Sequence, residues 1–276
     1  MSIPTLDLNN GSGLPAIGFG TYTLKSDAGI ASMVSAIDEG YRLLDSAMNY
    51  ENETEVGAAV RASSVQREEL LVTTKLPGRH HGYTETIASL EQSLQNLGLD
   101  YVDLYLIHWP LPRVDKYVDS WRAMIELRDR GLVRSIGVSN FTPTQLTRLI
   151  TETGVTPAVN QVELHPKFPQ AQLREFHREH GIVTESWSPL GNRSDITSAP
   201  IITAIAEAHG RTPTQVVLRW HTQLAAVPIP KSANPERQRE NITIFDFELT
   251  ESEIAQISSL ESGRLWGGDP DTHEEF

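Results

Sequence analysis

Short apolar runs alternate with longer segments in which apolar residues recur at helical spacing along almost the whole chain. Such short runs, bounded by turn residues, are typical of buried strands, and the segments between them are typical of amphipathic helices. The pattern predicts a β-hairpin over residues 5–18. It then predicts eight strands at residues 17–20, 42–45, 70–75, 102–108, 133–139, 158–163, 182–187 and 225–230.

Several helix boundaries can be read directly from the sequence. Apolar positions end at a glycine in the segments that stop at Gly40 and Gly98, as helices often do. The sequence Thr-Pro-Thr-Gln occurs at 142–145 and again at 212–215. Each copy places an N-cap Thr, a Pro at the first helical position and a Gln three residues after the cap. Residues 250–253 open a last helix in a similar way.

Eight strands interleaved with helices favour a closed (β/α)8 TIM barrel of the α/β class, with an N-terminal β-hairpin and a C-terminal helix and tail. An open, doubly wound sheet is the alternative. No linker, low-complexity tract or charge run divides the chain, so residues 1–276 are expected to form a single domain.

Composition narrows the class of function. The 276 residues include 23 Lys+Arg and 36 Asp+Glu, for a formal net charge of −13, and no cysteine. The lack of cysteine excludes disulfides, a thiolate nucleophile, iron–sulfur clusters and cysteine-bound zinc. Excess acid disfavours nucleic acid and anionic membrane surfaces as partners, and no apolar run approaches the length of a membrane span. We expect a soluble cytoplasmic protein.

In a barrel, chemistry gathers where the strands end. Three successive predicted strands end at Asp45, Lys75 and His108, and Tyr50 follows in the loop after Asp45. A phenol has a pKa of about 10, and an adjacent ammonium lowers it. A carboxylate would hold that lysine charged, while the histidine could hydrogen-bond to a carbonyl oxygen. Each residue alone has an ordinary structural explanation, such as a turn, a solvated strand end or a core histidine. Their expected convergence favours catalysis.

Two other motifs are weaker. The Gly-rich segment 11–16 superficially matches a dinucleotide fingerprint, but Pro15 interrupts it and no long crossover helix follows. We interpret it as a hairpin turn at the base of the barrel. His80 and His81 lack partners at a regular metal-ligand spacing, so a flexible loop is favoured and no metal site is expected.

Three longer motifs resemble the signatures of the aldo-keto reductases. They are GYRLLDSAMNYENE at residues 40–53, RSIGVSNF at 134–141, and IPKS at 229–232 followed by Arg237 and Glu240-Asn241. They occur in family order, and the resemblance covers nearly the whole chain. It is strongest to the bacterial diketogluconate-reductase-like branch.

The resemblance implies a catalytic tetrad of Asp45, Tyr50, Lys75 and His108, with Tyr50 as proton donor. It implies NADP (NADPH) bound across the barrel mouth without a Rossmann domain. Trp187 matches the aromatic that stacks on the nicotinamide, although a buried strand residue is the alternative. The cofactor residues implied are Ser139, Asn140, Gln161, Trp187, Ser188, Leu190, Lys231, Ser232, Arg237 and Asn241. The substrate contacts implied are Tyr22, Met48, His108, Trp109 and Trp266.

The cations Lys231 and Arg237, with Ser232 and a short helix that Pro235 would open, favour NADP over NAD. Asn234 stands where the family often has another basic residue. These residues and the resemblance together predict NADPH-dependent reduction of a small-molecule aldehyde or ketone. The resemblance also implies a monomer. The alternatives are an NADP-binding sensor with negligible turnover and a metal-dependent barrel hydrolase.

Overall fold

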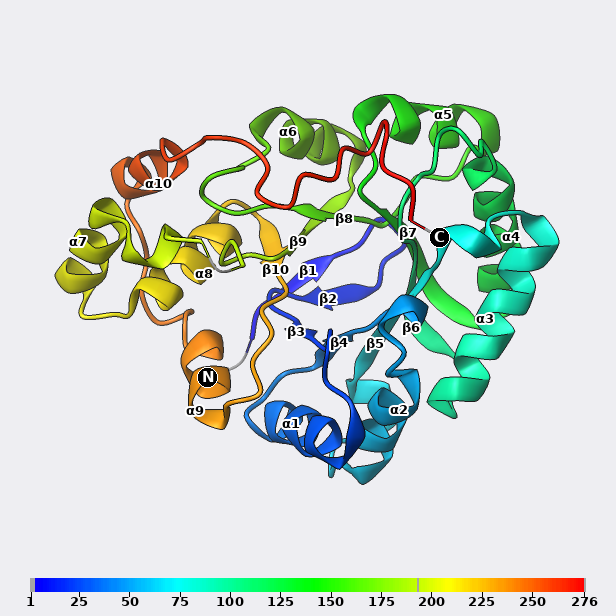
Figure 1. Ribbon diagram of the computed structural model, residues 1–276, viewed down its shortest axis with the longest axis horizontal. Coiled ribbons are helices and arrows are strands. Elements are labelled where there is room, and N and C mark those ends of the chain that lie inside the picture. Colours follow the sequence, from blue (N-terminus) through cyan, green and yellow to red (C-terminus); the bar gives the residue numbers. More distant parts are fainter. Residues whose placement is uncertain (1–2, 193, 276) are drawn as a thin grey trace.

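The computed structural model describes residues 3–192 and 194–275. Its central element is a parallel sheet of eight strands in the order β3 to β10 (Figure 1). The strands are β3 (Phe19–Gly20), β4 (Leu43–Asp45), β5 (Leu71–Leu76), β6 (Val102–Ile107), β7 (Val133–Ser139), β8 (Val159–Glu163), β9 (Val183–Trp187) and β10 (Ala226–Pro228). These agree with the eight predicted strands to within a residue or two at most ends.

The sheet curls until its two edges meet. The Gly18 N–H donates to the Pro228 carbonyl and the Gly20 N–H donates to the Pro230 carbonyl, both over 3.0 Å. Helices surround the strands as an outer ring (Figure 1). They are α1 (Ser26–Asp38), α2 (Glu53–Ala62), α3 (Tyr83–Leu97), α4 (Tyr117–Asp129), α5 (Pro143–Thr153), α6 (Ala171–His180), α7 (Pro200–His209), α8 (Pro213–Gln223), α9 (Pro235–Ile242) and α10 (Glu251–Ser258).

The helix caps predicted from the sequence are present in the structure. Thr142 and Thr212 are N-caps whose side chains and Gln partners complete capping boxes at α5 and α8, and Thr250 does the same at α10. Helix α3 ends at Gly98, which has φ of 64°, a left-handed conformation that glycine adopts at little cost. Local sequence thus fixes where several of the outer helices start and stop.

The core has two layers. One lies between the strands and the helices and includes the fully buried Trp121 and Trp220. The other fills the inside of the curled sheet and includes Leu43, Leu104 and Val227. Leu14, from the hairpin, packs into this inner layer.

The hairpin closes one end of the sheet. It consists of β1 (Thr5–Asp7) paired antiparallel with β2 (Gly13–Pro15). The Asn10 side-chain amide donates to Ser135 Oγ at the start of β7, over 2.9 Å. The Gly-rich segment 11–16 therefore lies in this hairpin, as expected. The residues predicted for catalysis lie at the opposite end of the sheet, where the strands terminate.

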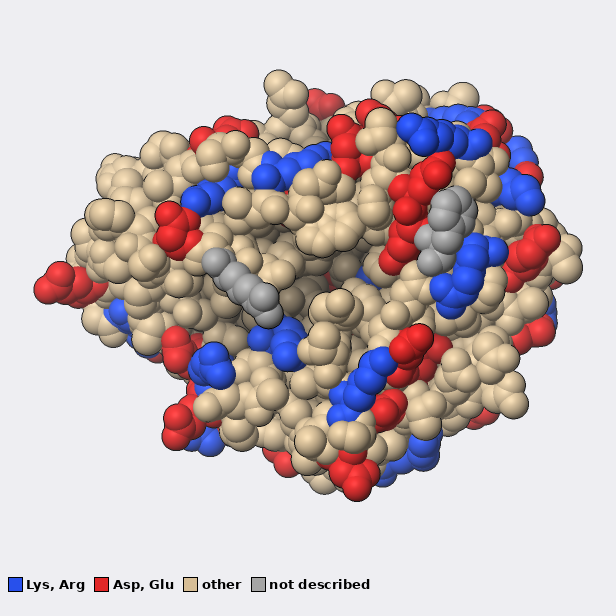
Figure 2. Space-filling model, viewed as in Figure 1, with Lys and Arg blue, Asp and Glu red and all other residues tan. Residues whose placement is uncertain are grey.

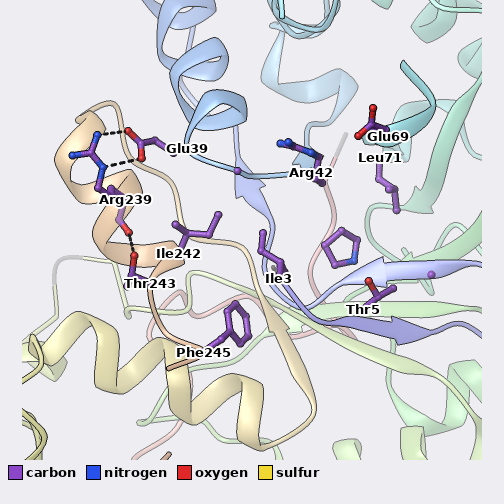
Figure 3. A pocket seen from close by; sticks show the side chains of 13 residues that line it. Ile3, Thr5, Glu39, Arg42, Glu69, Leu71, Arg239, Ile242, Thr243 and Phe245 are labelled. Carbon is purple, nitrogen blue, oxygen red and sulfur yellow. Dashed lines mark hydrogen bonds and ion pairs between the residues drawn. The ribbon is translucent and has the colours of Figure 1, made fainter. Parts of the chain in front are cut away.

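A cavity of about 550 Å³ also lies at the hairpin end (Figure 3). Its lining includes Thr5, Arg42 and Phe245, and Arg239 at its rim is paired with Glu39. None of the residues predicted for catalysis, cofactor or substrate lines it. This cavity is separate from the candidate active site.

The C-terminal segment beyond α10 runs across the end where the strands terminate (Figure 1). The space-filling view shows a hollow near the middle of that face, with acidic and basic side chains interspersed around it (Figure 2). Among the residues described, no helix is long and apolar enough to cross a membrane.

Candidate active site

Lys75 and Asp45 form a buried ion pair at the ends of β5 and β4. Lys75 Nζ lies 2.7 Å from Asp45 Oδ1 and 2.9 Å from Oδ2, and it also donates to the Ser46 carbonyl over 2.8 Å. Two carboxylate oxygens and one carbonyl oxygen thus accept from the ammonium. These hydrogen bonds hold the Lys75 ammonium in a fixed position at the carboxyl ends of the strands.

Tyr50 lies directly beside this pair. It ends a single helical turn, Met48–Tyr50, that follows β4. The buried Asn52 holds this loop in place, because its amide donates to the carbonyls of Thr21 and Leu24 and its Oδ1 accepts from Ser46 Oγ. Lys75 Nζ is 5.0 Å from the centre of the Tyr50 ring.

His108 completes the group of four. It follows β6, and its ring centre lies 6.0 Å from that of Tyr50 in an edge-to-face arrangement. Asn140 Nδ2 donates to the His108 backbone carbonyl over 3.0 Å. The structure therefore brings Asp45, Tyr50, Lys75 and His108 together, as the sequence predicts.

The electrostatics of Tyr50 differ in one respect from the simple expectation. Burial raises the pKa of Tyr50, the Lys75 ammonium lowers it, and the Asp45 carboxylate raises it, so that the net shift is upward. For Lys75, burial lowers the pKa, but Asp45 and Tyr50 outweigh it and the net shift is also upward. The lysine is therefore charged, and Tyr50 is a protonated phenol in this state of the protein.

A second polar network adjoins the four residues. Ser139 Oγ donates to the Gln161 carbonyl over 2.7 Å, and Asn140 Nδ2 donates to Ser139 Oγ over 3.0 Å. Trp187 Nε1 donates to Asn140 Oδ1 over 2.8 Å, and Gln161 Nε2 donates to Asp45 Oδ2 over 2.7 Å. These four predicted cofactor residues thus form one connected cluster with Asp45.

The predicted phosphate segment lies between β10 and α9. Pro235 occupies the first turn of α9, as expected, and Asn234 is its N-cap, with Oδ1 accepting from the Arg237 backbone N–H over 3.1 Å. Asn234 therefore caps α9 through its side-chain oxygen, a role that a lysine or arginine side chain cannot fill because it has no acceptor. Lys231 and Arg237 are exposed, and neither has an ion-pair partner among residues 3–192 and 194–275.

The other residues predicted for the cofactor are more enclosed. Ser232 and Asn241 are buried, and Ser232 Oγ accepts from the Asn234 N–H over 3.1 Å. Ser188 and Leu190 follow β9 and are partly exposed.

The predicted substrate residues gather near Tyr50 and His108. The Tyr22 ring is 5.1 Å from the Tyr50 ring, and 61% of Tyr22 is exposed. Met48 lies in the same turn as Tyr50. Trp109 follows His108 and stacks on Trp266 of the C-terminal tail, with 5.5 Å between ring centres. Trp266 also meets Trp187 edge-to-face at 5.9 Å.

Two glutamates that sequence reasoning missed tie the tail to this end of the sheet. Buried Glu163 Oε1 accepts from the backbone N–H groups of Leu265 and Trp266, over 2.7 and 3.0 Å. Glu275 Oε2 lies 3.1 Å from His108 Nδ1. Neither role has a local signal, because both partners are distant in sequence.

His80 and His81 are more ordered than the flexible loop expected for them. His80 ends a helical turn, Gly78–His80, and its Nδ1 lies 3.0 Å from Ser89 Oγ. His81 is buried, and burial lowers its pKa to about 4. Among the described side chains, no group of three or more His, Asp or Glu is arranged to hold a metal ion.

Comparisons with known proteins agree on one family. Residues 16–262 match the model of the aldo/keto reductase family. The chain is 62% identical to 2,5-diketo-D-gluconic acid reductase B of a Corynebacterium species, over 100% of this chain and 99% of that protein. It is 50% identical to an aldo-keto reductase of Mycolicibacterium smegmatis, with 98% of each chain covered. The crystal structure of a Gox0644 variant in complex with NADPH superposes with a TM-score of 0.94 at 42% identity, covering 99% and 100% of the two chains.

Proposed function

The chain belongs to the aldo/keto reductase family, and from this premise we propose that Tyr50 donates the proton in its NADPH-dependent reduction of an aldehyde or ketone to an alcohol. As a member of this family the protein is an NADP-dependent oxidoreductase. The observation that carries the assignment of Tyr50 is the position of its ring beside the buried Lys75–Asp45 pair.

Each of the four residues has a distinct task. Tyr50 gives its phenolic proton to the carbonyl oxygen, and Lys75 stabilises the phenolate that remains. Asp45 keeps Lys75 charged and aimed, since it receives two of its three hydrogen bonds. His108 donates a hydrogen bond to the same carbonyl oxygen and so polarises and orients it.

The residues around the tetrad fit a nicotinamide dinucleotide. When bound, NADPH supplies the hydride. Gln161 Nε2 is committed to Asp45 and Glu185, which leaves Oε1 as an acceptor for a carboxamide N–H. The indole N–H of Trp187 is held by Asn140, so that its ring plane is fixed for stacking. Exposed Lys231 and Arg237 beside the α9 N-terminus provide the charge that a 2′-phosphate requires.

We further propose that the curled sheet is a closed (β/α)8 barrel forming a single domain, and that the protein is a monomer. The two hydrogen bonds between the first and last strands support closure. The side chains that fill the inner core then close one end of the barrel, and reaction occurs at the other.

A panel of aldehydes and ketones, assayed with NADPH and with NADH side by side, tests this function. We expect substrate-dependent consumption of NADPH and slower consumption of NADH. An NADP-binding sensor would instead bind NADPH tightly without consuming it on any substrate. That result would reject the enzymatic assignment while leaving the cofactor site intact.

A further inference from the structure

Glu185 is a buried carboxyl group to which the reaction above assigns no task. It lies in the middle of β9, where its neighbours in the sheet are Gln161 and Val227. Its flanking residues Thr184 and Ser186 bond to His177 and His221 on the outer helices. Because strand side chains alternate, Glu185 points to the inside of the sheet, and none of its surface is exposed.

Gln161 links this carboxyl group to the tetrad. Its Nε2 donates to Asp45 Oδ2 over 2.7 Å and to Glu185 Oε2 over 2.9 Å. An amide NH₂ group has two N–H donors, and both are used here. Glu185 Oε1 is buried and has no hydrogen-bond partner among the described residues. Burying a charged carboxylate with one oxygen that accepts no hydrogen bond would cost free energy.

If Asp45 and Glu185 were both ionised, the single Lys75 ammonium could not neutralise both of them. The charged groups that face Glu185 are Asp45 on β4 and Lys75 on β5, while its strand neighbours Gln161 and Val227 carry no charge. One ammonium therefore serves two carboxyl groups. The Lys75 ammonium contacts Asp45 directly, so its positive charge compensates Asp45 rather than Glu185. Burial and the nearby Asp45 raise the pKa of Glu185 to about 8.

We propose that Glu185 is a positioning residue for proton transfer: it is a neutral acid that holds Gln161 against Asp45, and its ionisation in alkali adds a buried negative charge that keeps Tyr50 protonated. This inference rests on the role proposed for Tyr50. In reduction, the Tyr50 proton goes to the carbonyl oxygen, while in alcohol oxidation the Tyr50 phenolate takes a proton from the alcohol. An added negative charge nearby favours the protonated Tyr50 phenol, which reduction needs, over the phenolate, which alcohol oxidation needs.

The test is the pH profile of Glu185→Gln. Glutamine keeps an oxygen that can accept from Gln161 but cannot ionise, so the local geometry is retained. A like charge added to the same buried cluster raises the pKa of an acidic group, by on the order of one unit. We therefore expect the alkaline limb of kcat for reduction to move down by roughly one pH unit. The acidic limb of kcat for alcohol oxidation should move in the same direction.

Glu53→Gln is the matched control. Glu53 is also a buried glutamate, but its carboxylate accepts from Thr74 and Asn96 and makes no contact with Asp45. Its pH profile should keep the wild-type limbs. If Glu185 only filled space, Glu185→Gln would change stability or scale kcat at all pH values, with the limbs unmoved, and this would overturn the inference. If Glu185→Gln does not fold, Glu185→Met is used and the same shift is expected.

Infrared spectroscopy supplies a readout that does not depend on turnover. At neutral pH the wild type should show the C=O band of a protonated carboxylic acid that Glu185→Gln lacks, and this band should vanish in alkali. Its absence would contradict the neutral acid. If the wild type reduced no carbonyl compound with NADPH, the proposed function would fail. If it did so and the limbs did not move in Glu185→Gln, this inference alone would fail.

Discussion

At the scale of the residue, the central feature is a tyrosine whose acidity is set by opposing influences. Burial and the Asp45 carboxylate raise the pKa of Tyr50, and the Lys75 ammonium lowers it. A raised pKa keeps the phenol protonated before reaction, as a proton donor must be. The ammonium matters afterwards, because it stabilises the phenolate once the proton has left.

Trp187 offers a spectroscopic test of the cofactor site. Its indole N–H is tied to Asn140 and its ring is partly exposed beside Trp266, so NADPH should stack on it and quench its emission. We expect NADPH to lower the tryptophan fluorescence of the wild type. Trp187→Ala should lose most of this quenching and bind NADPH more weakly, measured by fluorescence titration and calorimetry. Unchanged affinity together with unchanged quenching would contradict the assignment.

Sequence could predict that Asp45, Tyr50, Lys75 and His108 converge, because each lies at or just after a strand end. Asp45 and Lys75 end or nearly end β4 and β5, and parallel strand ends meet at one edge. Sequence could not foresee the net direction of the Tyr50 pKa shift, which depends on burial. Nor could the sequence show that Asn234 caps α9. The comparison with the family indicated only that a basic residue is lacking at this position.

At the scale of the element, the start of α9 should decide between the two nicotinamide cofactors. Lys231 and Arg237 are exposed cations, and charge-assisted hydrogen bonds to a phosphate contribute about 1.5–3 kcal/mol each. Lys231→Met and Arg237→Met should therefore weaken NADPH binding about tenfold or more and leave NADH binding nearly unchanged. Rising salt should reduce the preference for NADPH in the wild type.

Arg239 is the matched control for this prediction. It lies on the same helix and is exposed, but its guanidinium is paired with Glu39 through two hydrogen bonds. Arg239→Met should leave the dissociation constants of both cofactors as they are in the wild type. Equal weakening of NADPH and NADH by the Lys231 and Arg237 substitutions would show instead that the segment is only a solvated loop.

The C-terminal tail should depend on Glu163. The Glu163 carboxylate accepts hydrogen bonds from the backbone N–H groups of Leu265 and Trp266. Burial raises the pKa of Glu163, but His165 and these two N–H groups lower it by more, so that the net shift is downward. Glu163→Gln should loosen the tail, since an amide oxygen accepts these bonds less strongly. We expect KM for the carbonyl substrate to rise severalfold, with a smaller change in the dissociation constant of NADPH. A fall in kcat at unchanged KM would contradict an anchoring role.

The predicted strands and caps were reliable because local pattern determines them. The eight strands carry short apolar runs, and the capping boxes at 142, 212 and 250 need only four neighbouring residues. The path of the tail is different. It depends on Glu163 and on the stacking of Trp266 with Trp109, contacts that join residues far apart in the chain. No periodicity in the sequence reports them.

At the scale of the whole molecule, buried histidines should make the fold sensitive to acid. His177 accepts from Asn160 through Nε2, 3.0 Å away, so its Nδ1–H donates to Thr184 Oγ1. Burial lowers the pKa of both His177 and His221 to about 3. The unfolded chain protonates these rings near pH 6.5, so their contribution to stability is present above pH 6.5 and is lost as pH falls toward 3.

The measurement is the free energy of unfolding in urea between pH 7.5 and 4.5. Each histidine that protonates only when unfolded should lower stability by about 1.4 kcal/mol per pH unit below its unfolded pKa. His177→Gln should be less stable than the wild type at pH 7.5. Its free energy of unfolding should fall less steeply below pH 6.5, because its unfolding takes up about one proton fewer. His180→Gln, an exposed residue of the same helix, should keep the wild-type slope. A slope unchanged in His177→Gln would contradict this account of acid sensitivity.

The proposed reaction depends on Tyr50 as the proton donor, and Tyr50→Phe tests this role most directly. Phenylalanine keeps the ring beside Lys75 and removes the hydroxyl. With a good aldehyde substrate, we expect kcat to fall by about 10²–10⁴ while the dissociation constant of NADPH stays near the wild-type value. Near-normal reduction by Tyr50→Phe would contradict the mechanism proposed for this site.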